Sequence, residues 1–317
     1  MTRSLGILGI LVVGLALLLG SGIVVLAWQA SAGPLASLPR GGEPESVDQR
    51  DELRAGRHIQ HITLSDPRLG PIGFTVSLPD RLPDNRLPLL VVIGGVGTGE
   101  HNIRFVDAAG DNAVIGYDWP LPTAFPKGMS ALTELPSLRR RALAVPGQVA
   151  VMLRWLAAQP WSDSRRISLL GFSFGALAVP AAERLATQEG VHIRWTVLAY
   201  GGVGFDALVE GDRRIRPAWA RPLLGAGAEL LLRPLEPAEH LPHLGGNFLI
   251  LTAAQDTIVE PRASAKLEQL TPEPKTIIHT AGGHIGTGAE RQALLEKAMA
   301  ATRDWLIAEG AVNPVAR

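Results

Sequence analysis

A serine flanked by glycines is the first group in this sequence whose type and spacing could do chemistry. The run Gly171-Phe172-Ser173-Phe174-Gly175 follows an apolar stretch at 167–170 and precedes an apolar helical pattern that begins at Ala176. A strand that turns sharply into a helix strains the backbone at the serine, and glycines two residues to either side let strand and helix approach each other. This context predicts Ser173 as an exposed nucleophile. A serine that only caps the helix is the alternative.

A serine hydroxyl is a weak nucleophile and needs a neighbouring base, which in turn needs an orienting carboxylate. Downstream, the apolar run 248–252 leads into Asp256, and the run 276–279 leads into the glycine-rich loop that holds His284. The chain order serine, acid, histidine is the one expected after a strand-turn-helix serine. We therefore predict His284 as the base and Asp256 as the residue that orients it.

Other residues of the right type compete for these two roles. His279 falls within a predicted strand and is interpreted as a packed or edge residue, whereas His284 lies in a loop that is free to reach across. Asp206 and Glu260 remain alternative acids.

Acyl transfer also needs donors for the oxyanion, and backbone N–H groups supply them without reorganisation. One donor should be the N–H of Phe174, directly after the nucleophile. The second is assigned to Val96, with Gly95 as the neighbouring candidate, in the glycine-rich loop 94–99. A dinucleotide-binding role for that loop is rejected, because Glu100 stands where the third glycine belongs and no Gly-Lys-Ser/Thr follows.

The elements that must position these residues follow from hydrophobic periodicity. Short apolar runs alternate with helical patterns, which is typical of a mostly parallel sheet covered by helices. Helical periodicity is clearest at 146–158, 175–187, 262–270 and 289–309, and eight strands are predicted, the first two as an antiparallel hairpin: 58–64, 73–78, 89–93, 113–117, 167–170, 195–200, 248–252 and 276–279.

The stretch 204–245 interrupts this alternation with proline, arginine and a leucine-rich segment. We interpret it as an insertion, or lid, over the strand ends. A longer crossover helix packed on the sheet is the alternative. The segment Leu223–Leu232, together with Trp119 and Phe125, is a candidate wall of an apolar acyl pocket, and ordinary packing explains each of them equally well.

Composition excludes several classes of function. Thirty basic and thirty acidic side chains cancel, so no electrostatic argument favours a nucleic-acid partner. The chain has no cysteine, which removes disulfides, thiolate metal sites and cysteine nucleophiles. The predicted chemistry requires neither a metal nor an organic cofactor.

The N-terminal region predicts a membrane segment. Residues 5–28 are uncharged and apolar, and as a helix they would reach about 36 Å, enough to span a bilayer. Arg3 precedes this run and the next basic residue is Arg40, so the rest of the chain should be exported. Residues 1–30 are expected to be an uncleaved anchor, 31–50 a linker and 51–317 the folded domain. Cleavage after Ala32, as in a signal peptide, is the alternative.

Together these residues resemble the α/β-hydrolase superfamily, and within it the dienelactone-hydrolase and acyl-peptidase-like branch. The resemblance covers about 58–310 and implies an α/β-hydrolase fold with an eight-stranded, mostly parallel sheet. Gly94-Gly95 stands where many relatives carry His-Gly. Besides the serine motif, the resemblance rests on Trp155-Leu156 before the segment 163–171, on Pro242-His243-Leu244 before the acid strand, on Val259 and Pro261 after Asp256, and on Gly283-His284.

The expected function is a membrane-tethered, exported serine hydrolase that cleaves an ester, thioester or amide through an acyl-enzyme on Ser173. The partners implied are a small-molecule or acyl substrate and the membrane. A catalytically silent binding protein of the same fold and an acyltransferase with the same three residues remain alternatives.

Overall fold

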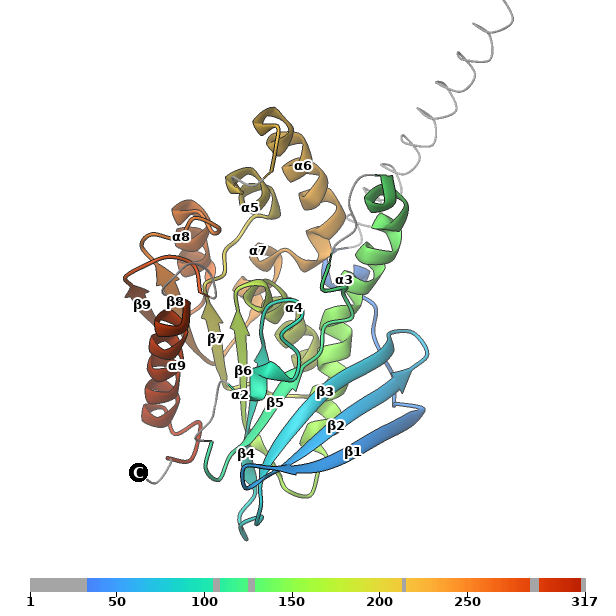
Figure 1. The fold of residues 1–317 in the computed structure, drawn as a ribbon, viewed down its shortest axis with the longest axis vertical. Coiled ribbons are helices and arrows are strands. Elements are labelled where there is room, and N and C mark those ends of the chain that lie inside the picture. Colours follow the sequence, from blue (N-terminus) through green and yellow to red (C-terminus); the bar gives the residue numbers. More distant parts are fainter. Residues whose placement is uncertain (1–32, 105–108, 125–128, 213–214, 286–290, 315–317) are drawn as a thin grey trace, which may run out of the picture.

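Nine strands form one sheet through the molecule, in the order β1-β2-β3-β5-β4-β6-β7-β8-β9 (Figure 1). The computed structural model describes residues 33–104, 109–124, 129–212, 215–285 and 291–314. The strands are β1 (Ser46–Arg54), β2 (Arg57–Asp66), β3 (Gly70–Pro79), β4 (Leu87–Ile93), β5 (Ala113–Tyr117), β6 (Ser162–Phe172), β7 (Trp195–Ala199), β8 (Asn247–Ala253) and β9 (Lys275–Thr280).

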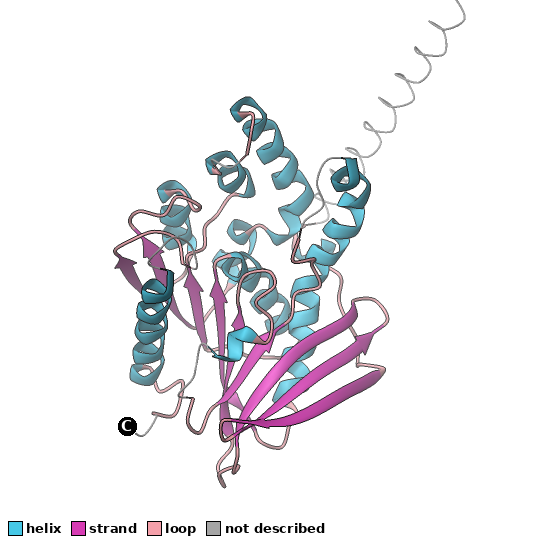
Figure 2. Cartoon of the chain, viewed as in Figure 1, coloured by secondary structure: helices cyan, strands magenta, loops and turns pink. Residues whose placement is uncertain are grey.

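The sheet is mostly parallel. Strands β5, β4, β6, β7, β8 and β9 run parallel to one another, whereas β1, β2 and β3 pair in antiparallel fashion and β3 joins β5 antiparallel. All eight strands expected from periodicity are present, and the expected hairpin is β2 and β3. The three antiparallel strands extend away from the parallel part (Figure 2).

The ninth strand, β1, differs from the sequence-based expectation. It begins at Ser46, so the end of the predicted linker 31–50 belongs to the sheet. Leu35 and Leu38, earlier in that segment, are buried in the core. Eight of the nine β1 residues are exposed, so the strand is held by backbone pairing with β2 along the sheet edge. A strand with no buried face shows no alternation of apolar and polar residues, which is why periodicity missed it.

The two faces of the sheet pack against different helices, as alternation along a strand requires. On β4, Leu89, Val91 and Ile93 join the core cluster that contains residues of α3 (Met129–Ala157) and α4 (Phe174–Gln188). Leu90 and Val92 join the second cluster, which contains residues of α9 (Arg291–Ala308). Because both faces are covered, β4 is apolar throughout rather than alternating.

The remaining helices are short and lie in the connections. The segment between β7 and β8, which contains the predicted insertion, is helical, and its main helices, α5 and α6, pack on each other. Between β7 and β8 lie α5 (Phe205–Gly211), η2 (Ala218–Ala220), α6 (Arg221–Leu232), η3 (Arg233–Leu235), α7 (Pro237–His240) and η4 (Leu241–His243). Elsewhere are η1 (Leu35–Ser37), α2 (His101–Arg104) and α8 (Pro261–Leu270).

The predicted membrane segment, residues 1–30, lies outside the described residues. Within the described part of the chain, no helix combines the length and apolar composition that a bilayer crossing needs.

The helix that follows Ser173, α4, carries a buried carboxyl group. Glu183 of α4 is 1% exposed, and Thr196 Oγ1 donates a hydrogen bond to its Oε2 at 2.7 Å. Burial raises the pKa of Glu183 to about 8, against the partly opposing hydrogen bond from Thr196. The folded protein therefore holds a proton there at neutral pH that the unfolded chain releases.

This proton makes the free energy of unfolding depend on pH. Between the ordinary carboxyl pKa and about 8 the folded state binds more protons than the unfolded state, so the free energy of unfolding falls as pH rises through that window. Glu183→Gln, which mimics the neutral acid, should flatten this dependence and raise the urea midpoint of unfolding at alkaline pH. Urea titrations from pH 5 to pH 9 measure it, and parallel curves for the two proteins would contradict the assignment.

Candidate active site

Ser173 occupies the sharp turn between β6 and α4 that the glycine spacing predicted. Its φ is 53° and its ψ −118°, a strained conformation for a residue with a side chain. Its N–H donates to Ala199 O at 2.8 Å, which ties the turn to the neighbouring strand β7. A Cβ on Gly171 would lie 2.7 Å from Ala176 Cα, and one on Gly175 would lie 1.8 Å from Ile93 O. Both positions therefore exclude side chains.

Ser173, His284 and Asp256 form one chain of hydrogen bonds. Ser173 Oγ lies 2.6 Å from His284 Nε2, and His284 Nδ1 lies 2.7 Å from Asp256 Oδ2. A carboxylate only accepts hydrogen bonds, so the histidine donates from Nδ1 and leaves Nε2 to accept from the serine hydroxyl. The three residues, predicted from separate loops, meet at the carboxyl ends of β6, β8 and β9.

The acid is itself held in place. Asp256 Oδ1 accepts hydrogen bonds from the N–H groups of Ile258 at 2.8 Å and Val259 at 2.9 Å. The side chains of His284 and Asp256 are only 3% and 4% exposed. Little water therefore competes for the hydrogen bond between them, and the imidazole keeps one orientation.

The competing residues lie elsewhere. His279 on β9 has a side chain that is 66% exposed and lies 2.8 Å from Thr252 Oγ1, away from the serine. Glu260 forms an ion pair with Arg262 at 2.7 Å. The exposed Asp206 accepts from the N–H of Ala207 at the start of α5.

The loop with Val96 follows β4 and lies against the serine turn. The contact is through Gly175, where a Cβ would lie 1.8 Å from Ile93 O and 2.9 Å from Gly94 O, so the start of the loop abuts the first turn of α4. Trp119 strengthens this link: its Nε1–H donates to Gly94 O at 3.0 Å, and its ring lies 5.1 Å from that of Phe174. The two predicted oxyanion donors, Val96 and Phe174, thus come from segments that are packed together.

Sequence reasoning missed a tyrosine beside the base. Tyr200 follows β7 with a φ of 56°, and its ring lies edge-on to His284 at a centroid distance of 6.0 Å. Its hydroxyl lies 3.1 Å from Thr280 Oγ1, on the strand that leads to His284. Tyr200 stands at the carboxyl end of a central strand and directly before Gly201-Gly202. This position could have indicated it from the sequence, because functional side chains of such sheets gather at that edge.

A mostly apolar pocket of about 260 Å³ opens beside Ser173 and His284. Part of the predicted wall is present: Ala228 and Leu232 of α6 line it, but Leu223 and Leu224 are exposed to solvent. Trp119 lines a small adjoining cavity instead, and Phe125 lies outside the described residues. Further apolar lining comes from the start of α4, from α5 and from neighbouring loops: Phe174, Leu177, Phe205, Leu208, Val209, Ile215, Ile258 and Val259.

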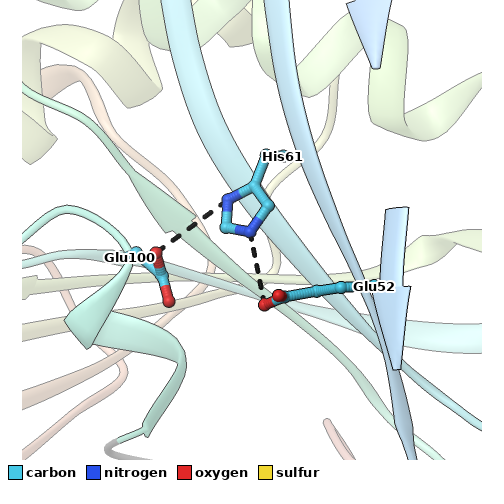
Figure 3. A group of neighbouring side chains, drawn as sticks. All are labelled: Glu52, His61 and Glu100. Atoms are coloured by element: carbon cyan, nitrogen blue, oxygen red, sulfur yellow. Dashed lines mark ion pairs between the residues drawn. The ribbon is translucent and has the colours of Figure 1, made fainter. Parts of the chain in front are cut away.

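Three side chains of metal-ligand type gather on the surface near the Val96 loop: Glu52, His61 and Glu100 (Figure 3). His61 Nε2 lies 3.5 Å from Glu52 and its Nδ1 4.0 Å from Glu100. Arg54 forms ion pairs with both carboxylates, at 2.7 Å for Glu100. Because this guanidinium pairs with both carboxylates and offsets part of their charge, the group is best described as a surface ion network that joins β1 and β2 to the loop.

A larger cleft of about 870 Å³ lies at the opposite ends of the strands. Within this cleft Arg166 donates hydrogen bonds to Asp163 and Asn313, both at 2.8 Å. The larger cleft is therefore not the one beside Ser173. The smaller, apolar pocket is the candidate substrate site.

Comparison of the whole structure with solved structures identifies the fold. Acetyl xylan esterase 1 from Thermoanaerobacterium sp. JW/SL YS485 superposes with a TM-score of 0.59 at 14% identity, covering 82% of this chain and 88% of that one. An acetyl xylan esterase from Paenibacillus sp. R4 gives 0.58 at 15% identity over 88% and 93% of the two chains. A cold-adapted esterase from an Arctic intertidal metagenomic library gives 0.55 at 16% identity over 82% and 97%.

This chain has the α/β-hydrolase fold. No protein-family model and no curated protein sequence matches it, so the likeness is one of structure. At these identities it establishes the fold alone, because α/β-hydrolase domains host many chemistries. What this α/β-hydrolase domain does must be argued from its own site.

Proposed function

We propose that the protein is a serine hydrolase that cleaves esters through an acyl-enzyme on Ser173. The observation that carries the proposal is the continuous hydrogen-bonded chain from Ser173 through His284 to the buried Asp256, placed at a strained turn beside an apolar pocket. Ester is favoured over thioester and amide because the three solved structures of the same fold named above are esterases.

The reaction follows from the hydrogen bonds. As Ser173 Oγ attacks the ester carbonyl, its proton passes to His284 Nε2, and Asp256 stabilises the resulting imidazolium. The tetrahedral intermediate collapses when His284 returns that proton to the departing alkoxide, which leaves the acyl group on the serine. A water molecule then repeats the sequence and releases the acid. These steps need no metal or organic cofactor.

The oxyanion hole is proposed to consist of the N–H groups of Phe174 and Val96. Val96→Pro deletes one of these donors and should lower kcat by roughly 10²- to 10³-fold, about 3 kcal/mol of transition-state stabilisation. Val96→Ala keeps the N–H and is the matched control, with turnover close to the wild type. If folded Val96→Pro keeps its turnover, the second donor is another group, with Gly95 the next candidate.

The pocket indicates the acyl part of the substrate. Apart from Ser173, His284 and Asp212 its lining is almost entirely apolar, so aliphatic acyl groups gain burial there that polar ones do not. A p-nitrophenyl ester series of increasing acyl length should therefore show kcat/KM rising from acetate before falling when the pocket is full. A fluorophosphonate probe should label the protein covalently. Absence of both labelling and ester turnover would favour a silent binding protein, and faster product formation with alcohol acceptors would favour an acyltransferase.

We further propose that residues 5–28 anchor the protein in a membrane and that the α/β-hydrolase domain is exported. Support comes from the uncharged apolar run and from the basic residue that precedes it. N-terminal sequencing of the mature protein tests the anchor: a start at Gly33 would refute it and leave export intact.

A further inference from the structure

Exposed apolar side chains cluster at one end of the helical insertion. Trp219 on η2 is 77% exposed, and Leu223 and Leu224 in the first turn of α6 are 71% and 50% exposed. We call residues 215–224 the α6 tip. Three large apolar side chains are thus exposed within six residues of the sequence, and exposed apolar patches mark interaction surfaces.

The same stretch of chain is basic. Between residues 213 and 228 the sequence has four arginines and no acidic residue, although charges cancel over the whole chain. Arg216, next to the cis-prolyl turn of the tip, is exposed. Tryptophan, leucine and arginine side chains together suit the boundary between lipid headgroups and acyl chains, where rings and leucines are buried and guanidinium groups contact phosphates.

The first described residues of the chain pack against α3, which in turn contacts α6. Pro39, six residues after the first described residue, contacts α3 at Gly147. Eight residues earlier on α3, about 12 Å along its axis, Arg139 donates to Leu231 O of α6 at 2.9 Å. Figure 1 shows α6 and the first turns of α3 projecting together beyond the sheet. The first described residues thus pack against α3, the helix that also contacts the end of α6 opposite the tip.

The helix that carries the tip also walls the pocket. Ala228 and Leu232 line the space beside Ser173, and Leu232 lies nine residues, or about 13 Å along the helix, from Leu223. A surface bound at Leu223 would thus lie about two and a half helical turns from Leu232, and Ile215, at the start of the tip, lines the pocket itself.

We propose that the α6 tip binds the surface of an anionic phospholipid bilayer, with Trp219, Leu223 and Leu224 inserted at the headgroup boundary and Arg216 against lipid phosphates. This surface is additional to the proposed esterase activity and does not depend on it. Combined with that activity, it would deliver esters that partition into the membrane.

Two other occupants fit the charges less well. The uncharged segment 5–28 could cover the leucines but would offer no partner to the arginines. A second copy of the chain docked tip to tip would bring like charges together, which is unfavourable. Phospholipids match both parts of the tip, because their acyl chains suit the apolar side chains and their phosphates suit the arginines.

The test exploits the absence of cysteine from the chain. Full-length Leu223→Cys, labelled with the polarity-sensitive fluorophore NBD, is reconstituted into vesicles of phosphatidylcholine with phosphatidylglycerol. We expect a blue shift of NBD emission and a loss of intensity when nitroxide-labelled lipids are included. High salt and vesicles of phosphatidylcholine alone should weaken both effects, because screening or removing the lipid charge removes the attraction. Adding Trp219→Ser and Arg216→Ser should abolish them.

The matched control carries the label at Arg165→Cys, where the wild-type side chain is 90% exposed at the opposite ends of the strands, and it should remain unquenched. Equal signals at 223 and 165 would overturn the proposal. A blue shift at 223 without quenching by lipid nitroxides would also overturn it, because the N-terminal segment would then be what covers the tip. A shift that grows with protein concentration in the absence of vesicles would assign it to a second copy. Undiminished quenching in neutral vesicles would overturn the role given to anionic lipid.

Discussion

Ser173→Ala should lower ester turnover by at least about a thousandfold while leaving the fold intact. The change removes only an oxygen atom that is hydrogen-bonded to His284 Nε2, so the apolar pocket and the strained turn remain. Without the hydroxyl no acyl-enzyme forms, and the residual rate comes from substrate positioning and oxyanion stabilisation. The kcat/KM for a p-nitrophenyl ester measures the effect, and labelling by a fluorophosphonate should disappear in parallel.

Ser168→Ala is the matched control, because Ser168 lies on β6, the strand that leads to Ser173, is fully buried, and its hydroxyl has no hydrogen-bond partner among the described residues. It should keep wild-type turnover. If Ser173→Ala hydrolyses esters at the wild-type rate, the proposed mechanism is wrong, whatever the geometry of the site.

Asp256→Asn gives the same mechanism a second readout. The asparagine oxygen can still accept from the N–H groups of Ile258 and Val259, which turns its NH₂ group toward His284 Nδ1. The imidazole must then accept at Nδ1 and carry its proton on Nε2, so it cannot take the proton of the serine. A loss of about 10⁴-fold in kcat is expected, with the structure unchanged.

Gly175→Ala should destabilise the fold by about 3 kcal/mol or more. The new Cβ would lie 1.8 Å from Ile93 O and 2.9 Å from Gly94 O, and both are backbone atoms that cannot rotate away. Relief requires α4 to move from β4, which also separates Phe174 from the Val96 loop. Urea unfolding should therefore show a lower midpoint, and any protein that still folds should have impaired turnover.

Gly227→Ala is the corresponding control within α6. A Cβ at this position would have nothing within 4 Å, so the substitution should stabilise the protein by about 0.5–1 kcal/mol through helix propensity and unfolded-state entropy. An unfolding midpoint for Gly175→Ala equal to that of the wild type would show that the contact between α4 and β4 tolerates a side chain.

Structure that depends on neighbouring residues in the chain could be predicted from local sequence patterns. The serine turn was predictable because its glycine spacing, the strand before it and the helix after it follow one another directly in the chain, between Ser162 and Gln188. The strands of the parallel sheet were predictable because burial on both faces makes them apolar runs. β1 was not, because it is an exposed edge strand supported by backbone pairing with β2.

The tertiary structure alone decided the contacts between distant segments. The bond from Trp119 to Gly94, the ring of Tyr200 against His284 and the direction of the α6 leucines depend on which strands and helices are neighbours, and no local period encodes that. The sequence by itself determined which residue types reach the carboxyl edge of the sheet: Ser173, Asp256 and His284 in their loops. Their meeting within hydrogen-bonding distance depends on the order β6-β7-β8-β9, which brings three separate loops to one edge.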